Sequence, residues 1–131
     1  MPQRDFDKTI AANDTSDVDP VELHRYASGG SSPGGRVLPG VWVPVQLPRP
    51  YVVLPAKMIE RTRRGAGTRK LEAVGLICRT RVQIVSGPGG KPDRLQRDGR
   101  WWVAHSAGDW LRGSNYYTAT FYLADEPLDE P

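Results

Sequence analysis

Short apolar runs rich in β-branched and aromatic residues begin at Val41 and recur along the rest of the chain. The runs at 41–45 (VWVPV) and 51–54 (YVVL) are interrupted or separated by prolines, and proline has no N–H to donate to a β-ladder. These runs therefore predict edge strands or strand ends.

Two segments of mixed polar and apolar residues flank Gly65-Ala66-Gly67. Glycine on both sides of Ala66 permits the positive φ that a hairpin loop needs. Residues 57–64 and 68–85 therefore predict a protruding β-hairpin. We expect its return limb to break at Gly75 and to continue as a half-buried strand, because its last residues alternate between polar and apolar.

The strongest turn signal lies in the C-terminal third. Asp98-Gly99 stands between Leu95 and the run Trp101-Trp102-Val103, which predicts a second hairpin. A final strand is expected over residues 115–124, which alternate with the period of a sheet. One face of this strand holds Tyr117, Ala119, Phe121 and Leu123. The whole pattern predicts a mainly β fold, a small β-barrel or sandwich with a protruding hairpin and an extended N-terminal arm.

The N-terminal part has a different character. Residues 1–17 are polar and Asp-rich, with too few large apolar side chains to bury a core alone, and so predict an extended arm. Asp19-Pro20 is typical of a helix start, so a short helix is expected after it. We expect residues 1 to about 36 to be dispensable for folding but needed for assembly, because their composition cannot support a core and a flexible linker follows the arm.

Length and composition fit one domain with attached segments. The chain has 131 residues with 14 Gly and 12 Pro, which favours strands and turns. No apolar run of about 18 residues and no apolar signal-peptide core occur, so we expect a soluble intracellular or virion product. The predicted parts are an acidic arm at 1–27, a Gly/Pro/Ser linker at 28–40, a β-barrel domain at 41–124 and an acidic tail at 125–131.

Charge is distributed in blocks along the chain. Residues 1–26 sum to about −3, residues 57–100 to about +8 and residues 101–131 to about −4. This asymmetry indicates that the middle of the chain meets an anionic partner, either nucleic acid or the acidic ends of neighbouring copies. A basic face that is merely solvated is the simpler alternative.

Candidate catalytic groups are few. The segment 87–91 has a lysine after glycines, but Pro92 stands where a phosphate loop needs Ser or Thr, so this interpretation is rejected. His105 and Asp109 have a spacing that suits general base catalysis, yet no activated nucleophile accompanies them. The single Cys78 is expected to be a small core residue rather than a reactive thiol. We therefore expect no enzymatic activity, no cofactor and no metal site.

A cluster of basic residues marks the expected hairpin tip. On such a tip these side chains can neutralise phosphates without regard to sequence, or bind carboxylates of a neighbouring subunit. Aromatic residues, which single-strand binders need for stacking, are absent from the tip. The cluster consists of Arg61, Arg63, Arg64, Arg69 and Lys70.

Large aromatic residues instead crowd the C-terminal third. Strand alternation sends about half of them inward, so a mixture of core and interface roles is expected. Because neighbours in a strand face opposite sides, one of Trp101 and Trp102 should lie in the core. The set proposed for core or interface is Trp101, Trp102, Trp110, Tyr117 and Phe121.

The stretch from Asp93 to Val103, then Gly108-Asp109-Trp110, then Asn115 to Ala119, resembles the C-terminal part of tailed-bacteriophage neck proteins of the head-closure or stopper type, also called head-tail adaptors. In that group a strand, an Asp-Gly turn, an aromatic strand, an Asp-Trp-like break and a Tyr-containing strand complete a compact β-barrel. The similarity covers about a quarter of the chain.

This resemblance implies a ring of identical subunits between portal or adaptor and tail, around double-stranded DNA in the channel. It also implies a structural role in the virion after assembly in the host cytoplasm. Two alternatives stay open from the sequence: a small basic β-barrel that binds nucleic acid, and a tail terminator or other tail-tube or baseplate ring protein. A hydrolase using His105 and Asp109 is a third, weaker interpretation.

Overall fold

The computed structural model describes residues 3–27, 33–35, 40–63, 67–84 and 90–124, with the backbone alone at residues 3, 4, 59, 61–63, 68 and 69. Most of the predicted linker at 28–40, the tip residues Gly65 and Ala66, much of the loop at 86–92 and the acidic tail at 125–131 lie outside the described residues.

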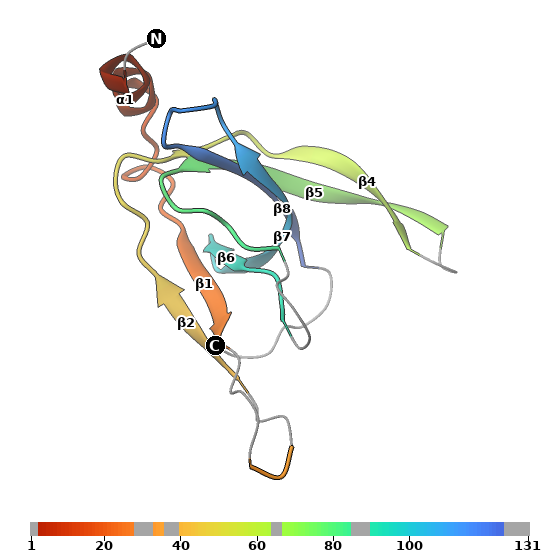
Figure 1. Cartoon of the computed structure of the whole chain (residues 1–131). Coiled ribbons are helices and arrows are strands. Elements are labelled where there is room, and N and C mark those ends of the chain that lie inside the picture. The colour runs from red at the N-terminus through yellow and green to blue at the C-terminus, as the bar shows by residue number, and fades with distance from the viewer. Residues whose placement is uncertain (1–2, 28–32, 36–39, 64–66, 85–89, 125–131) are drawn as a thin grey trace.

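The fold is mainly β, with one short helix and a strongly curled antiparallel sheet that forms a half-barrel (Figure 1). In the described part of the chain, the strand order is β2-β1-β6-β7-β8-β5-β3, and β4 pairs with β5 beside β3. The elements are α1 (Gln3–Ala12), β1 (Glu22–Ala27), β2 (Val41–Val45), β3 (Val52–Val53), β4 (Lys57–Arg63), β5 (Gly67–Cys78), β6 (Arg94–Arg97), β7 (Arg100–Asp109) and β8 (Tyr117–Leu123). The mainly β prediction is confirmed.

The main core fills the inner face of the curled sheet. Leu23, Leu95 and Trp102 meet there because they are paired across β1, β6 and β7. Leu76 and Phe121 extend the same core across β5 and β8. Trp102 is buried in this core, whereas Trp101 is only half-buried on the opposite face, as strand alternation requires.

A second, smaller core lies on the outer face, under α1. Phe6 and Ile10 stand four residues apart on one side of the helix and are buried against Val52, Ile77 and Tyr116. The prediction of an extended arm is therefore wrong for residues 3–12. Two large apolar side chains are too few to predict a helix from the sequence. In the folded protein the helix is stabilised because both side chains are buried against the sheet.

The helix predicted after Asp19-Pro20 is also wrong. Residues Glu22–Ala27 form β1, which lies inside the sheet between β2 and β6. The burial of Leu23 outweighs the local helix-start signal. Both α1 and β1 contribute buried side chains, which argues against the expectation that residues 1 to about 36 are dispensable for folding.

Both predicted hairpins are present. Asp98 and Gly99 have φ of 55° and 73° between β6 and β7, the left-handed pair that a two-residue turn needs. Gly67 opens β5 with a φ of 75°. However, β5 does not break at Gly75 but continues to Cys78. Glycine suits position 75 because a Cβ there would lie 2.8 Å from Leu54 Cδ1. The strand expected to continue beyond Cys78 is absent, since residues 79–84 form no strand.

Candidate nucleic-acid or subunit interface

The β4–β5 hairpin projects beyond the half-barrel (Figure 1). Its two strands pair from Lys57 opposite Ala73 to Arg63 opposite Gly67. On its other side, β5 pairs with β8 only from Ala73 onwards. In the described residues, the outer part of β5 is therefore paired with β4 alone, and the hairpin is a two-stranded ribbon there.

The structure brings together only part of the predicted basic cluster. Arg61 and Arg69 are directly opposite in the ladder, and Lys70 is exposed and opposite Glu60. Arg63 is the last residue of β4, whereas Arg64 lies outside the described residues. Because Lys70 adjoins Arg69 in a strand, the two residues belong to opposite faces of the ribbon.

Three aspartates of the N-terminal segment, Asp7, Asp17 and Asp19, have arginine partners inside the same subunit. Asp7 accepts hydrogen bonds from Tyr116 Oη at 2.9 Å and Arg79 Nη2 at 3.2 Å. Asp17 pairs with Arg49 at 2.6 Å, and Asp19 pairs with Arg97 at 3.0 Å. These contacts fix the segment to the half-barrel.

Asp14 lies just after α1, which ends at Ala12, and its carboxylate binds backbone N–H groups outside the helix. Its carboxylate accepts hydrogen bonds from the backbone N–H groups of Ser16 at 2.9 Å and Tyr51 at 3.2 Å. The N–H of Ser16 is the main reason that the pKa of Asp14 lies below its usual range. The carboxylate thus joins the end of the helix to the start of β3.

The five predicted aromatic residues serve mainly in packing. Trp102 and Phe121 lie in the main core. Trp110 packs edge-on against Phe6 and Tyr116 in the outer core, with centroids 6.0 and 6.1 Å apart. The remaining two are half-buried: Tyr117 lies 5.1 Å below the guanidinium of Arg81, and Trp101 packs edge-on against His24 at 5.0 Å.

Sequence reasoning did not find the stack around Arg94. This arginine is only 3% exposed, and its guanidinium carbon lies 3.5 Å from the ring centroid of Trp42 and 5.3 Å from that of Trp101. Cation–π contacts of this kind stabilise the face formed by β2, β1, β6 and β7. No local signal predicts them, because they depend on the pairing of β1 with β6.

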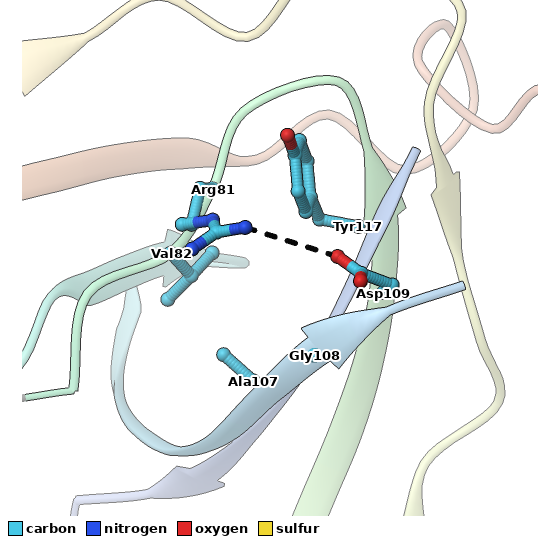
Figure 2. A pocket seen from close by; sticks show the side chains of 6 residues that line it. All are labelled: Arg81, Val82, Ala107, Gly108, Asp109 and Tyr117. Atoms are coloured by element: carbon cyan, nitrogen blue, oxygen red, sulfur yellow. Dashed lines mark ion pairs between the residues drawn. The ribbon is translucent and has the colours of Figure 1, made fainter. Parts of the chain in front are cut away.

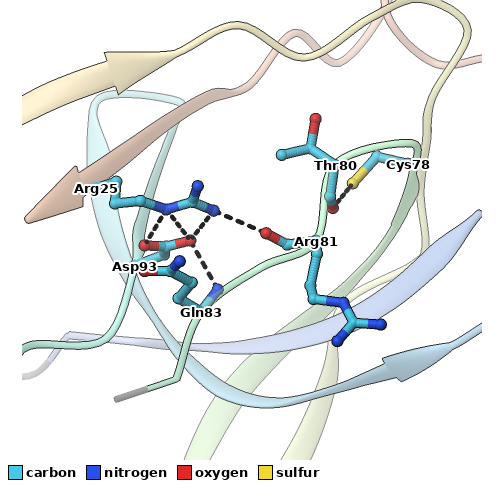
Figure 3. Close-up of polar contacts among 6 residues, drawn as sticks. All are labelled: Arg25, Cys78, Thr80, Arg81, Gln83 and Asp93. Carbon is cyan, nitrogen blue, oxygen red and sulfur yellow. Dashed lines mark hydrogen bonds and ion pairs between the residues drawn. The ribbon is translucent and has the colours of Figure 1, made fainter. Parts of the chain in front are cut away.

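The buried ion pair between Arg25 and Asp93 was also not predicted from the sequence (Figure 3). Asp93 is fully buried and accepts hydrogen bonds from Arg25 Nη2 at 2.9 Å and from the N–H of Gln83 at 2.9 Å. Arg25 Nη2 also donates to the carbonyl of Arg81 at 2.7 Å. These bonds hold residues 79–84 against the sheet without a β-ladder.

A cavity of about 340 Å³ lies beside this segment. Figure 2 shows the residues that line it. A β-bulge between Ala104 and Ser106 shifts the register of β7, so that Ala107 and Asp109 come to line the cavity. Arg81 Nη2 lies 3.9 Å from Asp109 Oδ1 there, a weak and exposed ion pair.

The candidate catalytic pair is not assembled. Asp109 faces Arg81, whereas His105 is exposed and packs edge-on against Tyr122. Cys78 is buried, and its loss of solvation raises the pKa of the thiol to about 11, so it remains protonated at neutral pH. Among the described residues, no group of three His, Cys, Asp or Glu side chains is placed to hold a metal ion.

Comparison of the sequence with models of known families and with curated proteins gives no match. Within the described ranges, no helix has the length and apolar character needed to cross a membrane. Function is therefore inferred from the fold and from the chemistry of its surfaces.

Proposed function

We propose that the protein is a structural component of a tailed-phage neck, of the head-closure type, and forms a ring that joins the head and portal to the tail around the DNA channel. Its partners are then further copies of itself, the portal or adaptor, the tail, and double-stranded DNA held by sequence-independent electrostatic contacts. It acts in the virion after assembly in the host cytoplasm.

The observation that carries this proposal is the unclosed sheet. The half-barrel ends in β2 on one side and in β3 and β4 on the other. Exposed apolar side chains mark both ends: Val41 is 60% exposed and Val43 40% on β2, and Met58 is 61% exposed on β4. Open edges of this kind favour association with another chain.

The two ends differ, so contact between them is head-to-tail. Head-to-tail contacts between identical subunits close into a ring when the rotation between them fits. The projecting β4–β5 ribbon supports the same assembly, because a two-stranded hairpin is only marginally stable in water by itself. In a ring, a neighbouring subunit or the DNA in the channel can contact the ribbon and stabilise it.

The test is the mass of the full chain at increasing concentration, followed by electron microscopy of the assembled species. We expect a concentration-dependent ring with a central channel. The double variant Val41→Glu/Val43→Glu should weaken ring formation, whereas Val18→Glu, at an exposed apolar position outside the edge strands, should not. A protein that stays monomeric up to its solubility limit would overturn the proposal.

Binding of the purified ring distinguishes the neck positions. Attachment to DNA-filled heads that lack tails supports the head-closure role. Attachment to isolated tails instead would favour a tail terminator or another tail ring. A monomer that binds DNA at moderate salt would favour the small basic nucleic-acid-binding barrel.

A further inference from the structure

We infer that one face of the β4–β5 ribbon binds the phosphate backbone of duplex DNA, through the positions Lys57, Arg61, Arg63 and Arg69. The inference rests on the proposed function, because it names which of the two anionic partners the hairpin meets within such a ring. The other partner, a carboxylate-rich segment of a neighbouring subunit, becomes an outcome of the test.

Charge is segregated between the two faces of the ribbon. Residues two apart in a strand share a face, and so do residues directly opposite in an antiparallel ladder. The pairs Arg61 with Arg69 and Arg63 with Gly67 therefore belong to one face. Lys57 belongs to the same face, which contains no acidic residue.

The other face has the opposite character. Glu60 is directly opposite Lys70, and Met58 is directly opposite Glu72. This face carries two acidic positions and one basic position, whereas the first face carries four basic positions. A ribbon that is merely solvated has no need for such separation, so the basic face is suited to one anionic surface.

Neighbouring residue pairs of the β4–β5 ladder differ in how well their charges match. Like charges directly opposite each other destabilise a strand pair, and opposite charges stabilise it. Arg61 and Arg69 form a pair of like charges, which destabilises the ladder, whereas the adjacent pair of Glu60 and Lys70 has opposite charges and stabilises it. The arginine pair therefore gains most from an anion placed over it.

Carboxylates in the N-terminal segment of a neighbouring subunit already have partners of their own. Asp7, Asp17 and Asp19 are paired with arginines of the same subunit. A neighbouring ribbon would have to break these pairs before it could bind the N-terminal segment. Binding of the ribbon to DNA phosphates does not break any of these ion pairs.

The composition and shape of the ribbon favour duplex over single-stranded nucleic acid. Residues 57–73 contain no Phe, Tyr or Trp, whereas single-strand binding depends on stacking of bases on aromatic rings. A two-stranded ribbon fits the major groove of duplex DNA. Arg61 and Arg63 lie about 6.6–6.8 Å apart along the strand, so each can meet a separate phosphate.

The test compares adjacent residues on opposite faces. Arg69→Gln and Lys70→Gln remove the same charge one residue apart, in the full-length protein. Binding is measured by fluorescence anisotropy with a labelled duplex of mixed sequence, over a series of salt concentrations. We expect Arg69→Gln to reduce the slope of log K against log salt by about one, and Lys70→Gln to leave it unchanged.

The triple variant Arg61→Gln/Arg63→Gln/Arg69→Gln enlarges the effect. It should reduce the slope by about three and the affinity by roughly 10²–10³-fold at about 0.1 M salt. An unchanged unfolding midpoint shows that the loss is not caused by misfolding. Equal losses in Arg69→Gln and Lys70→Gln would overturn the face-specific inference, as would tighter binding to a single-stranded oligonucleotide of the same length.

Ring formation separates this inference from the proposed function. If the triple variant loses ring assembly and keeps its DNA affinity, the face binds carboxylates of a neighbouring subunit, and the inference fails while the ring stands. If the triple variant loses DNA affinity in a protein that never forms rings, the inference holds and the proposed neck function fails.

Discussion

The strand β5 passes through two regions that differ in strand pairing, burial and charge. From Ala73 to Cys78 it is paired on one side with β8, and its inner residues Val74 and Leu76 lie in the main core. From Gly67 to Glu72 it is paired with β4 alone, in a ribbon dense in basic residues. Stability is concentrated at one end of the strand and surface charge at the other.

This contrast assigns different expectations to substitutions in the two regions. Changes in the half-barrel should lower the free energy of unfolding, because they remove buried contacts. Changes at the charged positions of the ribbon should alter association with a partner and leave the unfolding transition nearly unchanged.

The largest effect is expected at Trp102. Its replacement by alanine removes a large side chain from the main core and should lower the free energy of unfolding by about 3–5 kcal/mol. Trp101→Ala is the matched control on the outer face and should cost about 1 kcal/mol, because this ring is only half-buried. Urea unfolding followed by circular dichroism measures both. Equal, small losses would contradict the assignment of the inner face.

The next effect is expected at the buried Asp93. Asp93→Asn keeps the shape but leaves the guanidinium of Arg25 without its counter-charge, which should cost about 3 kcal/mol. Asp109→Asn breaks an exposed ion pair with Arg81 and should cost less than about 0.5 kcal/mol. Urea midpoints of the two variants provide the comparison. A neutral Asp93→Asn would mean that residues 79–84 are held by other contacts.

Ile10 tests whether α1 belongs to the half-barrel. Ile10→Ala should cost about 2–3 kcal/mol, because the side chain is buried between the helix and the outer face of the sheet. Lys8→Ala, at an exposed position of the same helix, should have almost no effect. Thermal unfolding measures both variants. An unchanged midpoint in Ile10→Ala would restore the idea of a detachable arm.

The features that the sequence predicted correctly depend on neighbouring residues. The turn at Asp98-Gly99 and the hairpin that ends at Gly67 follow from local backbone preferences, which a sequence displays directly. The inward position of Trp102 follows from alternation once the strand is placed. Local chemistry was therefore enough for the two hairpin turns and for the inward side of β7.

The features that were missed depend on distant residues. Helix α1 and strand β1 exist because the sheet buries Phe6, Ile10 and Leu23, and nothing near them in the sequence shows that surface. The Arg25–Asp93 pair joins residues 68 positions apart. For the candidate site, the sequence supplied the basic cluster, but only the ladder register shows that Lys70 and Arg69 belong to opposite faces.

The smallest effect on stability is expected in the ribbon. Arg61→Gln/Arg63→Gln/Arg69→Gln should shift the free energy of unfolding by less than about 0.5 kcal/mol, because these positions lie beyond the part of β5 that pairs with β8. Removal of the unfavourable Arg61–Arg69 pair can even raise stability slightly.

Leu71→Ala, at a buried position near the base of the ribbon, is the control and should cost about 2 kcal/mol or more. Urea unfolding of the three proteins at low and high salt separates the electrostatic part, since salt screens exposed charges. A triple variant as unstable as Leu71→Ala would mean that the arginines are part of the folded core's own ion pairs. The division between a stabilising half-barrel and a binding ribbon would then be wrong.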